Sequence, residues 1–184
     1  MIIEYLEEFK KISKDFYSQH NRREDLVRQY SWAIPTSKIL SIIKRYSPII
    51  EIGAGTGYWA KLLEDIGCDI LPIDKNPPKT KHNTFVHKKE YTSVVEGDQE
   101  TVKLFPDCNI FLCWPRMDNT AYLAATYLKV SNFLIYVGEL EYGCTADRAF
   151  FEYIQSNFIL VDNAIIPQWC EIQDTFLVYK KVKE

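Results

Sequence analysis

Three closely spaced glycines carry the strongest chemical signal in this chain. Gly53, Gly55 and Gly57 alternate with Ala54 and Thr56, directly before a predicted helix. Glycine has no Cβ, so the backbone can turn sharply and a ligand can approach its amide groups. The start of a helix adds free N–H donors and a favourable dipole for a carboxylate or phosphate. We therefore predict that this loop binds a ligand, with a tight turn that binds nothing as the alternative.

The spacing of the glycines distinguishes two kinds of nucleotide-binding loop. The fingerprint of dinucleotide-binding proteins, G-x-G-x-x-G, would need a third glycine at position 58. This chain has Tyr58 there, and its third glycine comes one residue earlier. A nicotinamide-dependent oxidoreductase is therefore a less favoured hypothesis.

The segment from Glu51 to Gly57, E-I-G-A-G-T-G, resembles motif I of the class I S-adenosylmethionine-dependent methyltransferases. The resemblance implies that residues 53–57 pass beneath the methionine part and the ribose of the cofactor, and that Glu51 helps to orient either the methionine end or the backbone of the loop. Asp74 ends a predicted strand and matches the acid that accepts hydrogen bonds from the ribose hydroxyls in that family. An aspartate suits this role because both of its oxygens can accept.

Weaker matches extend the resemblance. Lys75 follows Asp74 and is included in the predicted cofactor site, as are Gly97 and Asp98, which stand where the family often places an adenine contact. Trp114 follows a predicted strand at the place of motif IV, next to the transferred methyl group.

The chain also resembles a narrower group of small methyltransferase-like proteins whose function is undefined. The shared segments are residues 30–35, 113–115, 136–139, 143–147 and 166–169. Arg116 stands where that group usually has a second proline. Some methyltransferases bind the amino group that they methylate with an Asn/Asp-Pro-Pro-aromatic motif. The corresponding residues here start with Trp114 rather than a polar residue, so methylation of an amino group by that motif is not supported.

Aromatic and acidic residues are the candidates on the acceptor side. Methyl transfer depends on placing the acceptor atom close and in line, and a base helps only where the acceptor must lose a proton. The sulfonium is a cation, so the aromatic faces of Tyr30, Trp32 and Trp114 are suitable neighbours, with core packing as the alternative. Trp114 and Glu139 are the predicted catalytic residues. Glu139 follows a predicted strand, where it is a base, a substrate contact or a solvated loop acid.

Composition narrows the setting in which this chemistry takes place. The chain has 184 residues, 47% of them hydrophobic, and a formal charge of −3, which disfavours a disordered chain and a generally basic nucleic-acid binder. A local basic stretch over residues 75–89 keeps nucleic acid open as a disfavoured partner. Five cysteines without a C-x-x-C pair, and no clustered metal ligands, predict neither disulfides nor a metal site. Without a signal-peptide pattern or a long apolar run, we expect a cytoplasmic protein with no membrane partner.

The elements that must position these residues follow from hydrophobic periodicity. Helices are predicted over residues 2–19, 22–29, 36–46, 58–66, 119–128 and 146–156. Strands are predicted over residues 49–52, 69–73, 84–87, 109–113, 133–137, 158–165 and 175–180. This alternation predicts an α/β architecture, and the resemblance described above implies a Rossmann-like class I methyltransferase fold, with a seven-stranded, mostly parallel sheet and helices on both faces. We expect one domain over residues 1–184, with a helical lid over 1–46 that covers a core over 47–184.

The function that these features favour is S-adenosylmethionine-dependent methyl transfer to an unknown acceptor. A small-molecule acceptor is slightly favoured, because a chain of 184 residues leaves little room for a separate recognition domain. The alternative is a catalytically inactive module that keeps the fold for binding or assembly.

Overall fold

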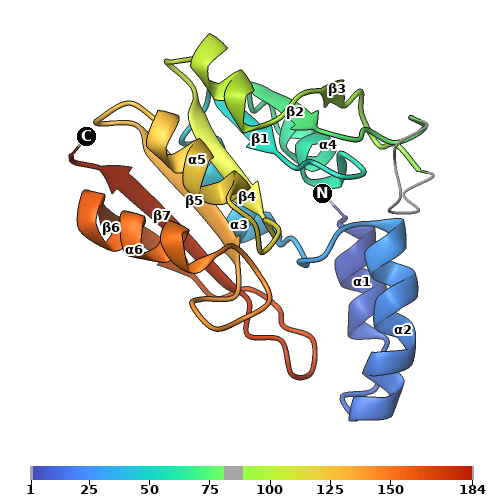
Figure 1. The fold of residues 1–184 in the computed structure, drawn as a ribbon. Helices are drawn as coiled ribbons and strands as arrows, with labels where there is room; N and C mark the ends of the chain where they lie inside the picture. Colours follow the sequence, from blue (N-terminus) through green and yellow to red (C-terminus); the bar gives the residue numbers. More distant parts are fainter. Residues whose placement is uncertain (1, 81–88, 184) are drawn as a thin grey trace.

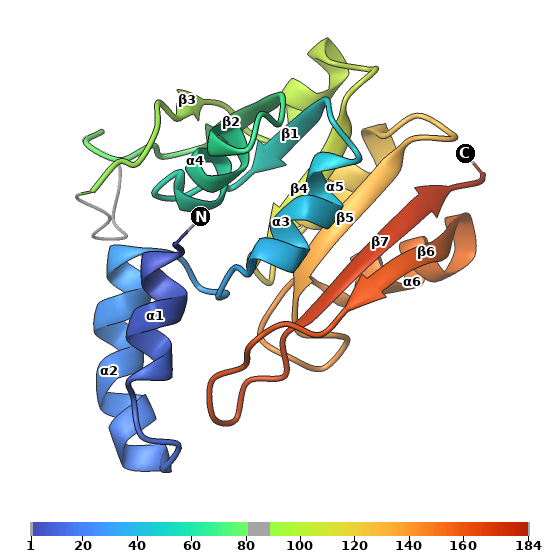
Figure 2. The same cartoon turned by 180° about the vertical axis from the view of Figure 1, so that it is seen from behind.

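A seven-stranded sheet lies between two layers of helices in the computed structural model, which describes residues 2–80 and 89–183 (Figures 1 and 2). The spatial order of the strands is β3-β2-β1-β4-β5-β7-β6. The strands are β1 (Ile49–Ile52), β2 (Ile70–Asp74), β3 (Val95–Glu96), β4 (Asn109–Cys113), β5 (Phe133–Gly138), β6 (Phe158–Ala164) and β7 (Thr175–Lys181). β7 runs antiparallel to β5 and β6, and the other neighbouring strands pair in parallel. The predicted seven-stranded, mostly parallel sheet is confirmed.

Helices cover both faces of this sheet, as predicted. α3 and α4 lie on one face, and the 3₁₀ helix η1 lies with α5 and α6 on the other (Figures 1 and 2). The helices are α1 (Glu4–Lys10), α2 (Phe16–Gln29), α3 (Ser37–Lys44), α4 (Tyr58–Asp65), η1 (Gln99–Leu104), α5 (Thr120–Tyr127) and α6 (Arg148–Asn157). In the described ranges, no helix is long and apolar enough to cross a membrane.

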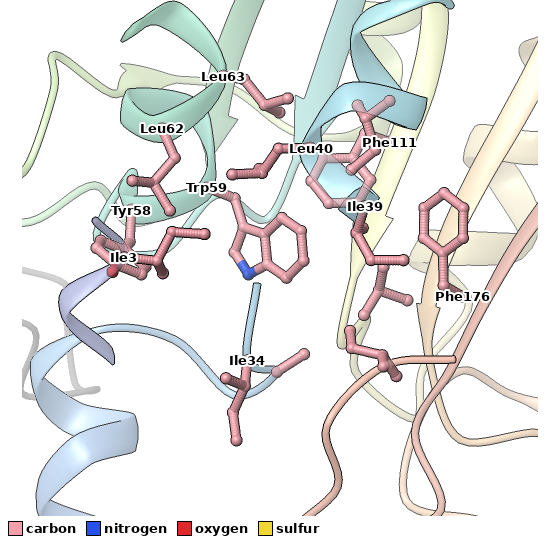
Figure 3. Close-up of a cluster of buried hydrophobic side chains, with 14 of the residues drawn as sticks. Ile3, Ile34, Ile39, Leu40, Tyr58, Trp59, Leu62, Leu63, Phe111 and Phe176 are labelled. Carbon is pink, nitrogen blue, oxygen red and sulfur yellow. The ribbon is translucent and has the colours of Figure 1, made fainter. Parts of the chain in front are cut away.

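The sheet divides the hydrophobic core into two clusters. Figure 3 shows the first, in which Trp59 of α4 lies among side chains that include Ile39 of α3 and Phe111 of β4. The second cluster lies on the opposite face and includes Phe150 of α6. The four residues of β1 are all buried, as expected for a central strand that is covered on both faces. The packing thus fixes β1, from whose end the glycine loop starts.

One predicted helix is wrong, and one predicted strand cannot be compared with the structure. The predicted helix over residues 2–19 is two helices, because α1 ends at Lys10 and α2 starts at Phe16. The side chain of Asp15 accepts a hydrogen bond from the backbone N–H of Ser18 (2.9 Å) and so starts a new helix, and the predicted helix over 22–29 is the second half of α2. The strand beside β2 is β3, at Val95–Glu96, whereas the predicted strand over 84–87 lies outside the described residues.

The first two helices form a hairpin that projects from the sheet layers (Figures 1 and 2). Tyr5 attaches this hairpin to the body, because its ring stacks on that of Tyr30 at 5.0 Å and its hydroxyl accepts a hydrogen bond from Trp169 Nε1 (3.1 Å). α3 belongs instead to a helical layer, where Ile39, Leu40 and Ile43 are fully buried. The division into a lid over 1–46 and a core over 47–184 stays a prediction, and only α1 and α2 have the place that a lid would need.

Candidate functional site

The glycine loop connects the end of β1 to the start of α4, and its three glycines have a left-handed backbone conformation. Gly53, Gly55 and Gly57 have φ values of 76°, 56° and 73°, a left-handed region that side chains disfavour. A Cβ on Gly57 would lie 3.0 Å from Val94 Cγ2, whereas Gly53 and Gly55 have no neighbouring atom within 4 Å of the place of a Cβ. The open side of the loop is therefore at Gly53 and Gly55, where a ligand can approach the backbone.

Asp74 lies at the end of β2 and holds this loop. Its Oδ2 accepts a hydrogen bond from the backbone N–H of Gly55 (2.9 Å), and its Oδ1 accepts one from the backbone N–H of Asn76 (2.8 Å). Each carboxylate oxygen can accept more than one hydrogen bond, so capacity remains for a ligand. The side chain is half-buried, next to the open face of the loop. The structure places Asp74 beside the loop, and its contact with a ribose stays a prediction.

Glu51 is a buried acid at the wall of a hollow beside the loop. It is 1% exposed, and its Oε2 has no hydrogen-bond partner. Burial, with a smaller effect from the nearby charge of Asp74, raises the pKa of Glu51 to about 8. The other residues that line this hollow are Tyr30, Ser31, Trp32, Gly53, Ala54, Gly55, Thr56, Trp59 and Cys113. An unpartnered carboxylate oxygen in a hollow is suited to bind a cationic or N–H-bearing ligand group.

The predicted residues Tyr30 and Trp32 both reach this hollow from the segment between α2 and α3. The hydroxyl of Thr56 donates to the carbonyl oxygen of Tyr30 (2.5 Å), which ties that segment to the glycine loop. Trp32 is 38% exposed, and its ring stacks on that of Trp114 at 5.0 Å with an interplanar angle of 11°. Trp32 thus borders the hollow, and Trp114 is stacked on it.

Trp114 follows β4 with a left-handed backbone (φ 53°), which is rare for a bulky residue. Its backbone N–H donates to the carbonyl oxygen of Val137 (2.8 Å), and its Nε1 donates to Oδ1 of Asp174 (2.7 Å). Both contacts hold the indole where the carboxyl ends of β4 and β5 meet. Its predicted place near the site is consistent with this geometry, and its catalytic role stays a prediction.

The carboxylate of Glu139 is occupied by backbone groups. Its Oε2 accepts from the N–H of Cys144 (2.8 Å), and its Oε1 accepts from the N–H of Gln173 (2.9 Å). This side chain joins the loop after β5 to the loop before β7. The predicted role of Glu139 as a base stays untested, and the geometry gives it a positioning role instead.

The remaining predicted residues lie along the β2–β3 side of the sheet edge. The backbone N–H of Gly97 donates to the carbonyl oxygen of Asp74 (3.0 Å), which places Gly97 and Asp98 next to the end of β2. Oδ1 of Asp98 accepts from the backbone N–H of Glu100 (2.9 Å) and caps η1. Lys75 is exposed next to Asp74. Their predicted contacts with an adenine or with another part of a cofactor stay predictions.

Asp174 and Arg23 are the charged residues that the sequence reasoning missed. Asp174 is 2% exposed and directly precedes β7, and because β7 is antiparallel, this position lies at the same edge as the end of β5. The guanidinium carbon of Arg23 on α2 lies 5.5 Å from the ring centre of Trp32 and 5.6 Å from that of Trp114. The signal for Asp174 was an acid directly before a predicted strand, but only the antiparallel pairing brings it to the site.

Comparisons with known proteins agree with this architecture. No family model and no curated protein matches the chain. A putative O-methyltransferase from Klebsiella pneumoniae is similar, with a TM-score of 0.54 and 14% identity over 98% of this chain and 96% of that one. The glycopeptide N-methyltransferase MtfA, complexed with S-adenosyl-L-homocysteine, has a TM-score of 0.50 and 11% identity over 92% of this chain and 99% of that one. MtNAS in complex with MTA and tNA has a TM-score of 0.52 and 11% identity over 97% of this chain and 69% of that one.

The order of strands and the antiparallel seventh strand define the fold class. The chain has the Rossmann-like class I methyltransferase fold, and it is structurally similar to many S-adenosylmethionine-dependent methyltransferases. At 11–14% identity the likeness establishes the fold, while the activity has to be argued from the site.

Proposed function

We propose that the protein binds S-adenosylmethionine on the glycine loop and transfers its methyl group to a small-molecule acceptor. The observation that carries the proposal is the pair of acids on either side of the open loop. Asp74 holds the amide of Gly55 and keeps capacity for a diol, and Glu51, which lines the adjoining hollow, has an oxygen without a hydrogen-bond partner. The described residues therefore fit a ligand that has hydroxyl donors at one end and an ammonium group at the other.

Each part of this cofactor has a suitable residue. The ribose hydroxyls would donate to Asp74, the methionine ammonium would pair with Glu51, and the Gly53 and Gly55 backbone would lie beneath them. S-adenosylmethionine, when bound, supplies an electrophilic methyl group on a positively charged sulfur. The indole of Trp114, held by Asp174, would border the acceptor. The binding of S-adenosylhomocysteine by MtfA and of MTA by MtNAS supports the proposal at the level of the fold.

Calorimetry with S-adenosylhomocysteine tests the proposal. Asp74→Ala should bind about 10- to 100-fold more weakly than the wild type, because hydrogen bonds to a charged group contribute roughly 1.5–3 kcal/mol each. Asp65→Ala removes an exposed acid from the end of α4 and is the matched control, with unchanged affinity expected. Thermal unfolding of both variants shows that the fold is kept.

Two outcomes would contradict the proposal in different ways. A wild-type protein that does not bind S-adenosylhomocysteine refutes cofactor use, and an Asp74→Ala variant with wild-type affinity refutes the ribose contact. Binding without methyl transfer to any small molecule would favour the alternative of an inactive binding module.

A further inference from the structure

The stacked indoles of Trp32 and Trp114 already have an organic cation beside them, the guanidinium group of Arg23. The rings of Trp32 and Trp114 are parallel and stacked, and the guanidinium of Arg23 lies within 5.6 Å of both ring centres. The faces of aromatic rings attract cations through their quadrupole, and paired aromatics are the usual means of recognising organic ammonium ions. In this structure the chain's own arginine takes that place.

A buried carboxylate adjoins the same rings. Asp174 holds Trp114 through Oδ1, while its Oδ2 is buried without a hydrogen-bond partner. The Nε atom of Arg23 is also buried without a partner. Leaving a buried polar atom unpaired costs free energy, so Oδ2 of Asp174 lacks a donor that a ligand could supply, while the N–H of Arg23 Nε lacks an acceptor where it now lies. An ammonium group is a hydrogen-bond donor and a cation, and it satisfies both the free carboxylate oxygen and the ring faces.

Two residues of this cluster, Trp32 and Arg23, line different hollows. Trp32 lines the hollow that contains Glu51 and the glycine loop. Arg23 lines a second hollow, formed by α2 and the segment before β7, whose wall also includes Phe16, His20 and Glu171. The second hollow thus offers aromatic surface and an acid beside Arg23, whose guanidinium lies against the two indoles.

We propose that Trp32, Trp114 and Asp174 form the acceptor subsite for an organic ammonium compound, and that Arg23 occupies this subsite until the acceptor displaces it. The inference rests on the proposed function and deepens it by naming the chemical class of the acceptor. Within the subsite, Oδ2 of Asp174 accepts one proton from the ammonium group. The nitrogen is then neutral and carries the lone pair that a methyl acceptor needs.

The electrostatic setting of Asp174 suits this proton transfer. Burial, opposed by the hydrogen bond from Trp114 and the charge of Arg23 and assisted by the nearby charge of Glu139, raises the pKa of Asp174 to about 7. A carboxyl group with this pKa can both take and release a proton near neutral pH.

Two probes of the same shape test the charge preference. Benzylamine is a cation at pH 7, and benzyl alcohol is its neutral counterpart. Each is titrated into the full chain with and without saturating S-adenosylhomocysteine, and binding is followed by calorimetry and by the indole N–H signal of Trp114 in protein labelled with ¹⁵N-tryptophan. We expect the wild type to bind benzylamine at least tenfold more tightly than benzyl alcohol.

Three variants separate the subsite from general effects. Arg23→Ala should bind benzylamine about tenfold more tightly than the wild type, because the internal competitor is gone. Arg22→Ala removes an exposed neighbour on the same helix and should match the wild type. Asp174→Asn keeps the shape and the oxygen that accepts from Trp114, and it should lose the preference for benzylamine.

Each other result overturns the inference. Equal binding of the two probes, no benzylamine binding by Arg23→Ala, or an unchanged preference in Asp174→Asn would show that this is not an ammonium subsite. Binding of S-adenosylhomocysteine without any preference between the probes contradicts only the ammonium subsite. A preference for benzylamine without binding of S-adenosylhomocysteine contradicts the proposed function instead.

Discussion

Replacement of Glu51 by glutamine should remove a pH dependence from cofactor binding. Glu51 is buried with a free Oε2, and its pKa is raised to about 8, so at pH 7 most of the free protein carries a neutral carboxylic acid. The ammonium group of the methionine end pairs with the ionised form. Binding therefore requires the loss of a proton from Glu51, and the affinity of the wild type should rise with pH until the pKa is passed.

The size of the effect follows from the fraction of protein that is ionised. With a pKa of about 8, the apparent dissociation constant exceeds its limiting value by about 100-fold at pH 6, about 11-fold at pH 7 and about 1.3-fold at pH 8.5. The wild type should thus bind S-adenosylhomocysteine about eightfold more tightly at pH 8.5 than at pH 7. The side chain of the Glu51→Gln variant stays neutral, so its affinity should be close to that of the wild type at pH 6 and clearly weaker at pH 8.5.

Calorimetry from pH 6 to pH 9 measures both curves. The ligand's own amino group titrates in this range, but it does so equally for the two proteins and cancels in the ratio of their affinities. MTA, which lacks the amino-acid end, is a second control and should bind the wild type with nearly the same affinity at every pH. Parallel curves for the wild type and Glu51→Gln, or a steep dependence with MTA, would refute the role of Glu51 at the methionine end.

Two further predictions concern stability. Lys181 is 1% exposed, and its Nζ donates to the carbonyl oxygens of Ala125, Thr126 and Leu128 at the end of α5, so Lys181→Met should lower the free energy of unfolding by roughly 3 kcal/mol or more. Urea unfolding checks this value against Lys180→Met, for which a change within about 0.5 kcal/mol is expected, and equal losses would contradict the capping role. Gly57→Ala should cost more stability than Gly53→Ala, since both carry the left-handed backbone cost of roughly 1–2 kcal/mol but only Gly57 has a side chain at 3.0 Å from the new Cβ. Thermal unfolding of the two variants measures the difference in stability. Equal destabilisation would show that the Val94 side chain moves aside without cost and would contradict the prediction.

Local signals in the sequence were sufficient to bring the glycine loop and Asp74 to one edge of the sheet. The glycine loop and Asp74 each follow a short apolar run, and parallel strands bring their carboxyl ends to one edge. The caps of two helices are equally local, since the side chains of Thr36 and Asp147 accept from the backbone N–H groups of Ile39 and Phe150, three positions further along the chain. These features depend on residues a few positions apart, which is why single-sequence reasoning finds them.

The acceptor side depends on contacts between distant segments. Nothing in the sequence pairs Trp32 with Trp114, or brings Arg23 to both. Asp174 reaches the sheet edge only because β7 runs against β5. The break between α1 and α2 was missed for a different reason, since apolar spacing continues through a segment that the capping side chain of Asp15 interrupts.

The place of β7 in the sheet has a consequence for the order in which the chain can assemble. β7 is synthesised after β6 but lies between β5 and β6 in the sheet. The strand with which β6 pairs in the folded protein is therefore absent until β7 has been synthesised. β1, β2 and β4, together with the glycine loop, pair without either strand and can form while synthesis continues. The pairing of β5 with β7 closes a long segment of chain, which makes it a slow step and leaves the edge of β5 exposed beforehand. During that interval the nascent chain would hold a formed glycine loop in a sheet whose β5 edge is open, and a chaperone or another copy of β5 could reach that edge.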